Sequence, residues 1–249
     1  MRNHQTPINI KLSVLLCGLM LLYSTTISGQ ENQIEADFVF VAPVIDGSPN
    51  DEVWQSAKPI TLRKNQSGDK VSDSILTTTV KTCYDTNKLY LLFICKDPDI
   101  WTSYNKRDDH LWKEEAVEVF IDVDEEPDNY VEIEVSPANV LFDSYIVDPQ
   151  NIDVTATAQL DLPGIETAVH VNGTLNIRND IDESWTVEIA IPFEDLTTRH
   201  TKKITNETEI KINFYRLDMN EGMDRGAYAW SPTGASFHKP SVFGRLILK

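Results

Sequence analysis

Apolar and polar residues alternate with a period of two along much of the chain, which is typical of β-strands with one buried face. The alternation is clearest at 116–123, where every odd position is valine or isoleucine. A second alternating run at 130–135 follows the turn-like segment 125–129. Paired as a hairpin, the two runs place four carboxylates on one face: Glu118, Asp122, Glu132 and Glu134.

Crowding of these ionised side chains would destabilise the fold through charge repulsion. Like charges on facing positions of neighbouring strands are unfavourable by a few tenths to about 1 kcal/mol per pair. The face is therefore either a solvated outer surface or a site that needs a compensating cation, hydrogen-bond donor or ligand. The pattern alone leaves both interpretations open.

Similar patterns predict the rest of the fold. An extended run at 38–44 leads into turn residues and one helical turn at 51–57, where Trp54 is expected in the core. A further helical turn is expected after Pro192, which ends a strand. Other strands are expected at 75–84, 88–96, from Leu141, at 165–177, 184–191, 209–217 and 243–249. About ten short strands separated by turns predict an all-β fold, a single antiparallel β-sandwich of the jelly-roll kind with short helical turns.

Cys83 and Cys95 lie on the two arms of the hairpin predicted at 75–96. The turn at 85–88 sets a register in which the two cysteines do not face each other, so a direct cross-strand disulfide does not fit. We expect two buried free thiols.

The first residues have the pattern of a secretion signal. Arg2 and Lys11 supply positive charge, and the apolar run after Lys11 is too short to cross a bilayer. With cleavage after Gly29, the chain divides into a signal peptide (1–29) and one domain (30–249). The mature protein is expected to be secreted or periplasmic, without membrane insertion.

The charge balance narrows the choice of partners. The formal net charge is −17 for 249 residues, and removal of 1–29 takes away two cations and no acid, which leaves −19 on 220 residues. A strongly acidic protein is repelled by phosphate backbones and anionic lipids. We therefore expect no nucleic-acid partner.

Six segments occur together in an order that resembles the carbohydrate-binding module family 9-like domains. The resemblance extends from about Ile45 to Leu248. The segments are VIDGSPNDEVW, CYDTNKLYLLFICKD, LWKEEAVEVFID, SWTVEIAIPF, INFYR and AWSPTGASFHKPSVFG.

The resemblance implies a non-catalytic domain that binds a glucose- or xylose-type saccharide, or a polysaccharide chain end, between two tryptophans. Trp112 and Trp230 match the stacking pair, and Glu118, six residues after Trp112, matches a carboxylate that accepts sugar hydroxyls. A pyranose presents an apolar C–H face to an indole, and its hydroxyls suit charged planar partners. Arg216 and His238 are further candidates for hydroxyl contacts, although Arg216 could instead neutralise the acidic face and His238 could fill a loop. For each tryptophan, ordinary packing is the alternative.

The resemblance also implies partners and ions. Such modules accompany glycoside hydrolases and raise their local substrate concentration, so we expect a role in extracellular polysaccharide breakdown, with hydrolases or a surface glycan-uptake complex as partners. Structural calcium occurs in the family, and no cofactor is otherwise expected.

Three other functions compete with sugar binding. Glu118, Glu132 and Glu134 are candidate carboxylates for a glycosidase, which needs two of them about 5–10 Å apart. A b-type haem domain would use Met219, Met223 or His238 as ligands. A calcium-stabilised structural or adhesive domain would draw on hard oxygen ligands, of which the candidates are Asp97, Asp99, Asp108, Asp109, Asp122 and Asp124.

Overall fold

The computed structural model describes Met1 and residues 32–72, 74–125, 129–158, 161–197 and 202–249. The predicted signal peptide lies outside these ranges except for Met1, and so does most of the turn at 125–129. The strands are β1 (Gln33–Phe38), β2 (Ile60–Thr61), β3 (Arg63–Lys64), β4 (Thr78–Tyr84), β5 (Lys88–Lys96), β6 (Ala116–Asp122), β7 (Tyr130–Val135), β8 (Leu141–Ile146), β9 (Glu166–Asn172), β10 (Ser184–Pro192), β11 (Glu209–Asp218), β12 (Gly226–Ala229) and β13 (Gly244–Leu248). The helices are α1 (Glu52–Ser56), α2 (Val154–Thr157) and α3 (Phe193–Thr197), with 3₁₀ turns η1 (Ser74–Leu76), η2 (Leu111–Lys113) and η3 (Pro240–Val242).

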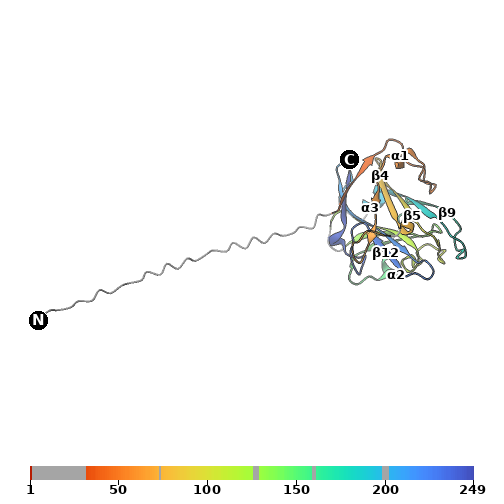
Figure 1. Ribbon diagram of the computed structural model, residues 1–249. Coiled ribbons are helices and arrows are strands. Elements are labelled where there is room, and N and C mark those ends of the chain that lie inside the picture. Colours follow the sequence, from red (N-terminus) through yellow and green to blue (C-terminus); the bar gives the residue numbers. More distant parts are fainter. Residues whose placement is uncertain (2–31, 73, 126–128, 159–160, 198–201) are drawn as a thin grey trace. The chain divides into compact units, whose positions relative to one another are not determined.

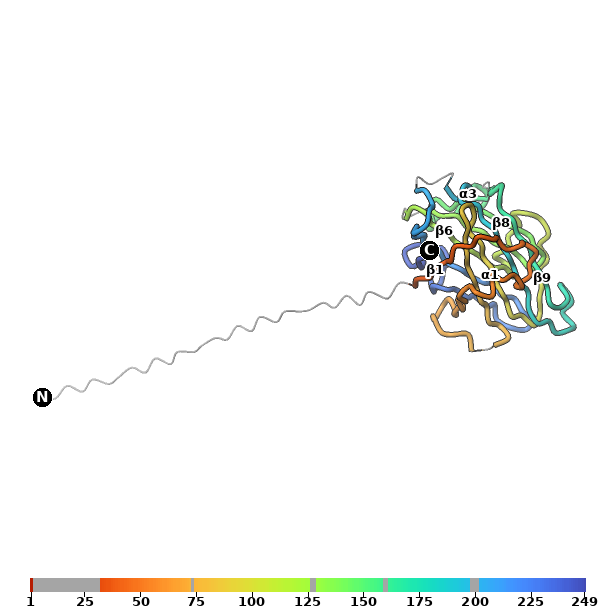
Figure 2. The backbone as a smooth tube through the Cα atoms, turned by 90° about the horizontal axis from the view of Figure 1, so that it is seen from above, coloured from red at the N-terminus to blue at the C-terminus, as the bar shows by residue number. Residues whose placement is uncertain are grey.

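The strands form two sheets that β1 joins. Figure 1 labels β4, β5 and β9 of one sheet and β12 of the other. Sheet A has the order β8-β7-β6-β11-β13, with β12 beside β11 and β3 beside β12, and sheet B has the order β4-β5-β10-β9, with β2 beside β4. β1 pairs in parallel with β13 and with β4, whereas the other named strand pairs are antiparallel. Figure 2 shows β1 beside the chain's C-terminal end.

The predicted all-β class is confirmed, but the prediction of a purely antiparallel sheet is wrong. The reason is the first strand, Gln33–Phe38, which mostly precedes the extended run expected at 38–44. These six residues run in the same direction as the last strand, so their pairing is parallel and the complete sheet is mixed.

The hydrophobic core lies between the inward faces of the two sheets. Val117, Val119 and Ile121 of β6 belong to one buried cluster with the inward residues of β5 and β10. Rings from the two sheets meet directly, since the centroids of Phe93 and Phe214 are 6.0 Å apart. Because side chains alternate along a strand, the even positions of β6 and β7 are left on the outer face of sheet A.

The first hairpin confirms two further predictions. Its register places Cys83 opposite Tyr90 and Cys95 opposite Thr78, and both cysteines are buried and free.

Trp54 of α1 is completely buried against the outer face of sheet B, as predicted. Within the described part of the chain, no helix has the length and apolar character needed to cross a membrane.

Candidate functional site

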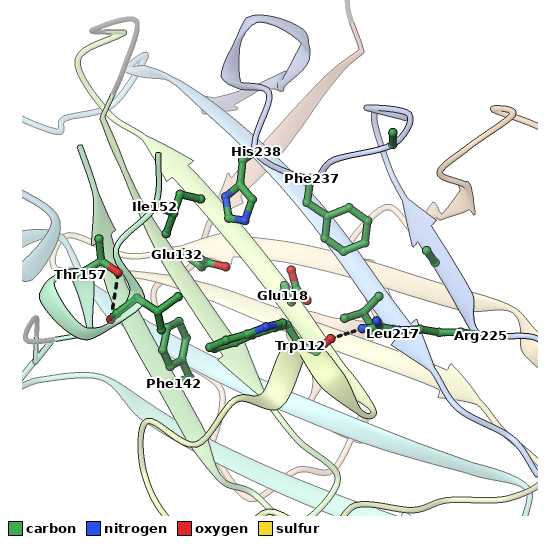
Figure 3. Close-up of a pocket in the computed structure, with 13 residues that line it drawn as sticks. Trp112, Glu118, Glu132, Phe142, Ile152, Thr157, Leu217, Arg225, Phe237 and His238 are labelled. Atoms are coloured by element: carbon green, nitrogen blue, oxygen red, sulfur yellow. Dashed lines mark hydrogen bonds between the residues drawn. The ribbon is translucent and has the colours of Figure 1, made fainter. Parts of the chain in front are cut away.

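A cavity of about 410 Å³ lies over the outer face of sheet A (Figure 3). Strand residues form its floor, the segment after β8 forms one wall, and the loop before η3 forms another. The lining residues are Trp112, Glu118, Glu132, Phe142, Ile152, Val154, Thr157, Leu217, Arg225, Ala227, Ala235, Phe237 and His238. Aromatic rings and a small number of polar groups around one cavity are typical of sites for small molecules.

The register of sheet A brings the acidic side chains together as predicted. Glu118 lies directly opposite Glu134, and Glu132 lies two residues earlier in β7, opposite Phe120. Oxygen atoms of these three carboxyl groups lie within 4.8 Å of one another. Asp122 shares the face but does not line the cavity.

The acidic face is buried, which rules out the solvated-surface interpretation. Glu118, Glu132 and Glu134 are 1%, 6% and 0% exposed. Burial raises the pKa of Glu132 to about 7. Burial and the neighbouring carboxylates raise the pKa values of Glu118 and Glu134 well above the usual range. Protons therefore compensate the crowded charges, because ionised carboxylates are costly in a dry environment.

A protonated carboxyl group can donate one hydrogen bond and accept others. Glu132 accepts a hydrogen bond from the hydroxyl of Ser144 at 3.1 Å. Oε1 of Glu118 has no hydrogen-bond partner among the described residues. Figure 3 shows the Glu118 side chain in the cavity between Trp112 and Phe237. This carboxyl group is therefore placed to bind a ligand.

Trp112 forms one wall of the cavity from the 3₁₀ turn directly before β6. Its indole packs edge-on against Phe142, with ring centroids 5.2 Å apart. The ring of His110 packs against it at a tilt of 35°, with centroids 4.6 Å apart. The guanidinium of Arg225 donates a hydrogen bond to the backbone carbonyl of Trp112, as Figure 3 shows. These contacts hold a half-buried indole beside Glu118.

His238 and Phe237 form the opposite wall (Figure 3). The ring of His238 stacks on Phe120 at 5.3 Å, and its Nδ1 is hydrogen-bonded to the hydroxyl of Tyr130 at 2.6 Å. Burial lowers the pKa of His238 to about 4, so the imidazole is neutral near pH 7. The ring of Phe237 stacks in parallel on Tyr215 at 4.1 Å, and the Tyr215 hydroxyl donates a hydrogen bond to the Phe237 carbonyl at 2.9 Å.

Trp230 does not take the predicted position opposite Trp112. It is 7% exposed and packs against Phe214 at 5.6 Å within the core between the sheets. The cause is the parity of the strand: Ala229 pairs with Tyr215 on the outer face, so the next residue turns inward. Trp230 therefore has the packing role that was the alternative for it.

Arg216 also lies away from the cavity. Its side chain is fully buried on the inward side of β11, where its guanidinium donates hydrogen bonds to Asp97 at 2.8 Å and to Asp218 at 2.7 Å. It also donates to the carbonyl of Lys96 at 2.7 Å. Arg216 thus neither contacts the cavity nor neutralises the acidic face of β6 and β7, and both predictions for it are corrected.

The structure bears on the metal and haem predictions. Among the described residues, two groups of acidic side chains are close enough to share an ion. The first is Glu118, Glu132 and Glu134, and the second is Asp97, Glu115 and Asp218. The second group already contains the guanidinium of Arg216 as its cation, so it does not fit calcium. Calcium elsewhere stays a prediction. Of the three proposed haem ligands, His238 lines this cavity and the two methionines do not.

Sequence reasoning found Trp112, Glu118 and His238, which the structure brings together, and missed several lining residues. Phe142 follows Leu141 in an alternating strand, so its parity could have placed it on the outer face. Phe237 is an aromatic residue in a loop and directly precedes His238, which the sequence analysis predicts as a site residue. Arg225 had no signal in the sequence pattern.

Comparison with known proteins shows the family of this chain. Residues 45–249 match the family model described as "Carbohydrate family 9 binding domain-like". Endo-1,4-beta-xylanase A of Thermotoga maritima is 31% identical over 208 residues, which cover 83% of this chain and 17% of that protein, so the chain spans about a sixth of the xylanase. An "Extracellular protein" of Arthroderma benhamiae is 28% identical over 178 residues, covering 68% of this chain and 78% of that protein.

A solved structure shares the fold. It is a carbohydrate binding module family 9 from Caldicellulosiruptor kristjanssonii in complex with cellotriose. The TM-score is 0.62 at 20% sequence identity, and the match covers 88% of this chain and 94% of that chain.

Proposed function

The chain belongs to the carbohydrate family 9 binding domain-like family, whose members are non-catalytic binding domains, and from this premise we propose that the cavity over sheet A is its saccharide site. One observation carries the proposal: an indole and a buried, unpartnered carboxyl oxygen face the same cavity. Trp112 supplies the indole and Glu118 the oxygen.

The chemistry of this pair suits a sugar. The C–H face of a pyranose stacks on an aromatic ring, while its hydroxyls both donate and accept hydrogen bonds. A carboxyl group whose pKa is raised by burial also does both, so Glu118 and Glu132 match a neutral polyol better than they match an anion. The neutral His238 adds no charge to the opposite wall.

Phe237 replaces Trp230 as the second aromatic wall. Its ring is held by stacking on Tyr215, and it lies across the cavity from Trp112, with Glu118 between them (Figure 3). A sugar ring held by Trp112 is then within reach of the carboxyl groups on the floor. We assign Phe142 to support Trp112, because its edge packs against that indole.

The relatives support a particular ligand class. A glucose- or xylose-type saccharide, or the end of a polysaccharide chain, fits a family that includes part of a xylanase and a module complexed with cellotriose. Secretion into an extracellular setting, with glycoside hydrolases or a glycan-uptake complex as partners, belongs to the same proposal. The domain would hold the polysaccharide near such an enzyme and raise its local concentration.

The test is a titration of tryptophan fluorescence and a calorimetric titration with glucose, xylose, cellobiose, xylobiose and galactose. We expect a saturable signal that Trp112→Ala removes and Glu118→Ala weakens at least about tenfold, since leaving a buried hydrogen-bonding group without its partner costs roughly 1–3 kcal/mol. Trp101→Ala is the matched control, because Trp101 is also half-buried but lies outside the cavity against Arg178. Absence of binding at millimolar sugar, or equal loss in both tryptophan variants, would refute the assignment.

A further inference from the structure

A second cavity adjoins the first one. It has a volume of about 620 Å³ and lies between the loop 64–72 and the segment around β12. Four residues line both cavities: Arg225, Ala227, Ala235 and Phe237. The two cavities therefore meet along this line of residues.

Two small and two large side chains form the boundary between the cavities. Two of the four shared residues are alanines, whose side chains are too short to close a passage. Phe237 stacks on Tyr215, and the exposed Arg225 donates a hydrogen bond to the Trp112 carbonyl. A ligand that leaves the first cavity along this line passes the ring of Phe237 and the guanidinium of Arg225.

The far wall of the second cavity is held in place by Asn65, which is 2% exposed. Its side-chain amide donates to the Gly234 carbonyl at 2.7 Å, and its side-chain oxygen accepts from the backbone N–H of Thr233 at 2.8 Å. Lys64 adds backbone pairing with Tyr228 between β3 and β12. The loop 64–72 and the loop that carries Phe237 are thus one connected structure.

Polar and apolar side chains line this second cavity in similar measure. Gln66 and Lys64 lie exposed on one wall, and Asp224 lies exposed on the other. An amide, an ammonium and a carboxylate offer hydrogen-bond donors and acceptors, which suit hydroxyl groups. The first cavity, by contrast, offers a large aromatic surface.

We propose that the second cavity is a further sugar subsite, which takes the next units of the saccharide whose first unit lies against Trp112. This inference rests on the proposed function of the first cavity. The ligand class is then an oligosaccharide of at least two or three units, whose linkage passes between Phe237 and Arg225. Gln66, Lys64 and Asp224 contact hydroxyls of the later units.

The test compares affinities of mono-, di- and trisaccharides by isothermal titration calorimetry, in the glucose and xylose series. We expect the wild-type protein to bind the trisaccharide at least about tenfold more tightly than the monosaccharide, which corresponds to about 1.4 kcal/mol. In Gln66→Ala/Asp224→Ala, this gain falls to about twofold or less, while monosaccharide affinity is unchanged. Gln55→Ala, an exposed glutamine on α1, is the matched control and keeps the full gain.

Two results would overturn the inference in distinguishable ways. If the monosaccharide binds and longer chains gain nothing, or the double variant keeps the gain, the second subsite does not exist and the first site stands. If no saccharide of any length binds, the proposed function fails and this inference fails with it. Thermal unfolding of each variant checks that the fold is retained.

Discussion

Replacement of Glu132 by glutamine tests whether the acidic face is held together by protons. Glu132 is 6% exposed, and its carboxyl group lies against those of Glu118 and Glu134. Burial raises its pKa from 4.5 to about 7. Glutamine has the same shape as the protonated acid and cannot ionise, so Glu132→Gln keeps the neutral state at every pH.

The sign of the effect follows from the direction of the shift. An acid with a higher pKa in the folded state binds its proton more tightly there, so its stabilising contribution is complete below pH 4.5. The contribution is lost as the pH rises through about 7. At about 1.4 kcal/mol for each pH unit between the two pKa values, the total loss is about 3 kcal/mol. Between pH 5 and pH 8, the expected loss of stability is roughly 2–3 kcal/mol.

The assay is urea unfolding followed by tryptophan fluorescence at pH 5, 6, 7 and 8. The free energy of unfolding of Glu132→Gln minus that of the wild-type protein should increase by roughly 2–3 kcal/mol from pH 5 to pH 8. Glu194→Gln, at an exposed position of α3, is the control and should show no such trend. A difference between Glu132→Gln and the wild type that stays constant across this range would refute the reasoning, because Glu132 would then have the same pKa in both states.

Three further predictions concern residues outside the cavity. Trp230→Ala should lower the free energy of unfolding by about 3–5 kcal/mol in a urea titration, as expected for a large core residue, and a stable variant with weakened sugar binding would contradict its core role. Arg216→Met leaves Asp97 and Asp218 without their buried cation and should cost about 3–5 kcal/mol in the same assay, with an unchanged midpoint as the contrary result. The two free thiols, whose pKa values burial raises to about 12, should react with a thiol reagent only after denaturation, and rapid labelling of the folded protein would contradict their burial.

The local sequence pattern was sufficient to predict several features of this fold. The period of two in 116–123 and 130–135 predicts which side chains share a face, because alternation depends on backbone geometry alone. The turn at 85–88 likewise sets the register of the first hairpin and keeps Cys83 and Cys95 apart. The single helical turns at α1 and α3 follow from local turn residues and from Pro192.

Long-range contacts decided the rest. The acidic face is buried because the segment after β8 and the loop before η3 fold over it, and no local pattern encodes which loop covers which face. Arg216 binds Asp97 and Asp218 across the interior, although Asp97 is more than a hundred residues away in the chain. The parallel pairing of β1 arises because opposite ends of the chain meet. The period of apolar residues along a strand shows which of its faces is apolar. The packing of segments distant in the sequence determines which residues contact that face.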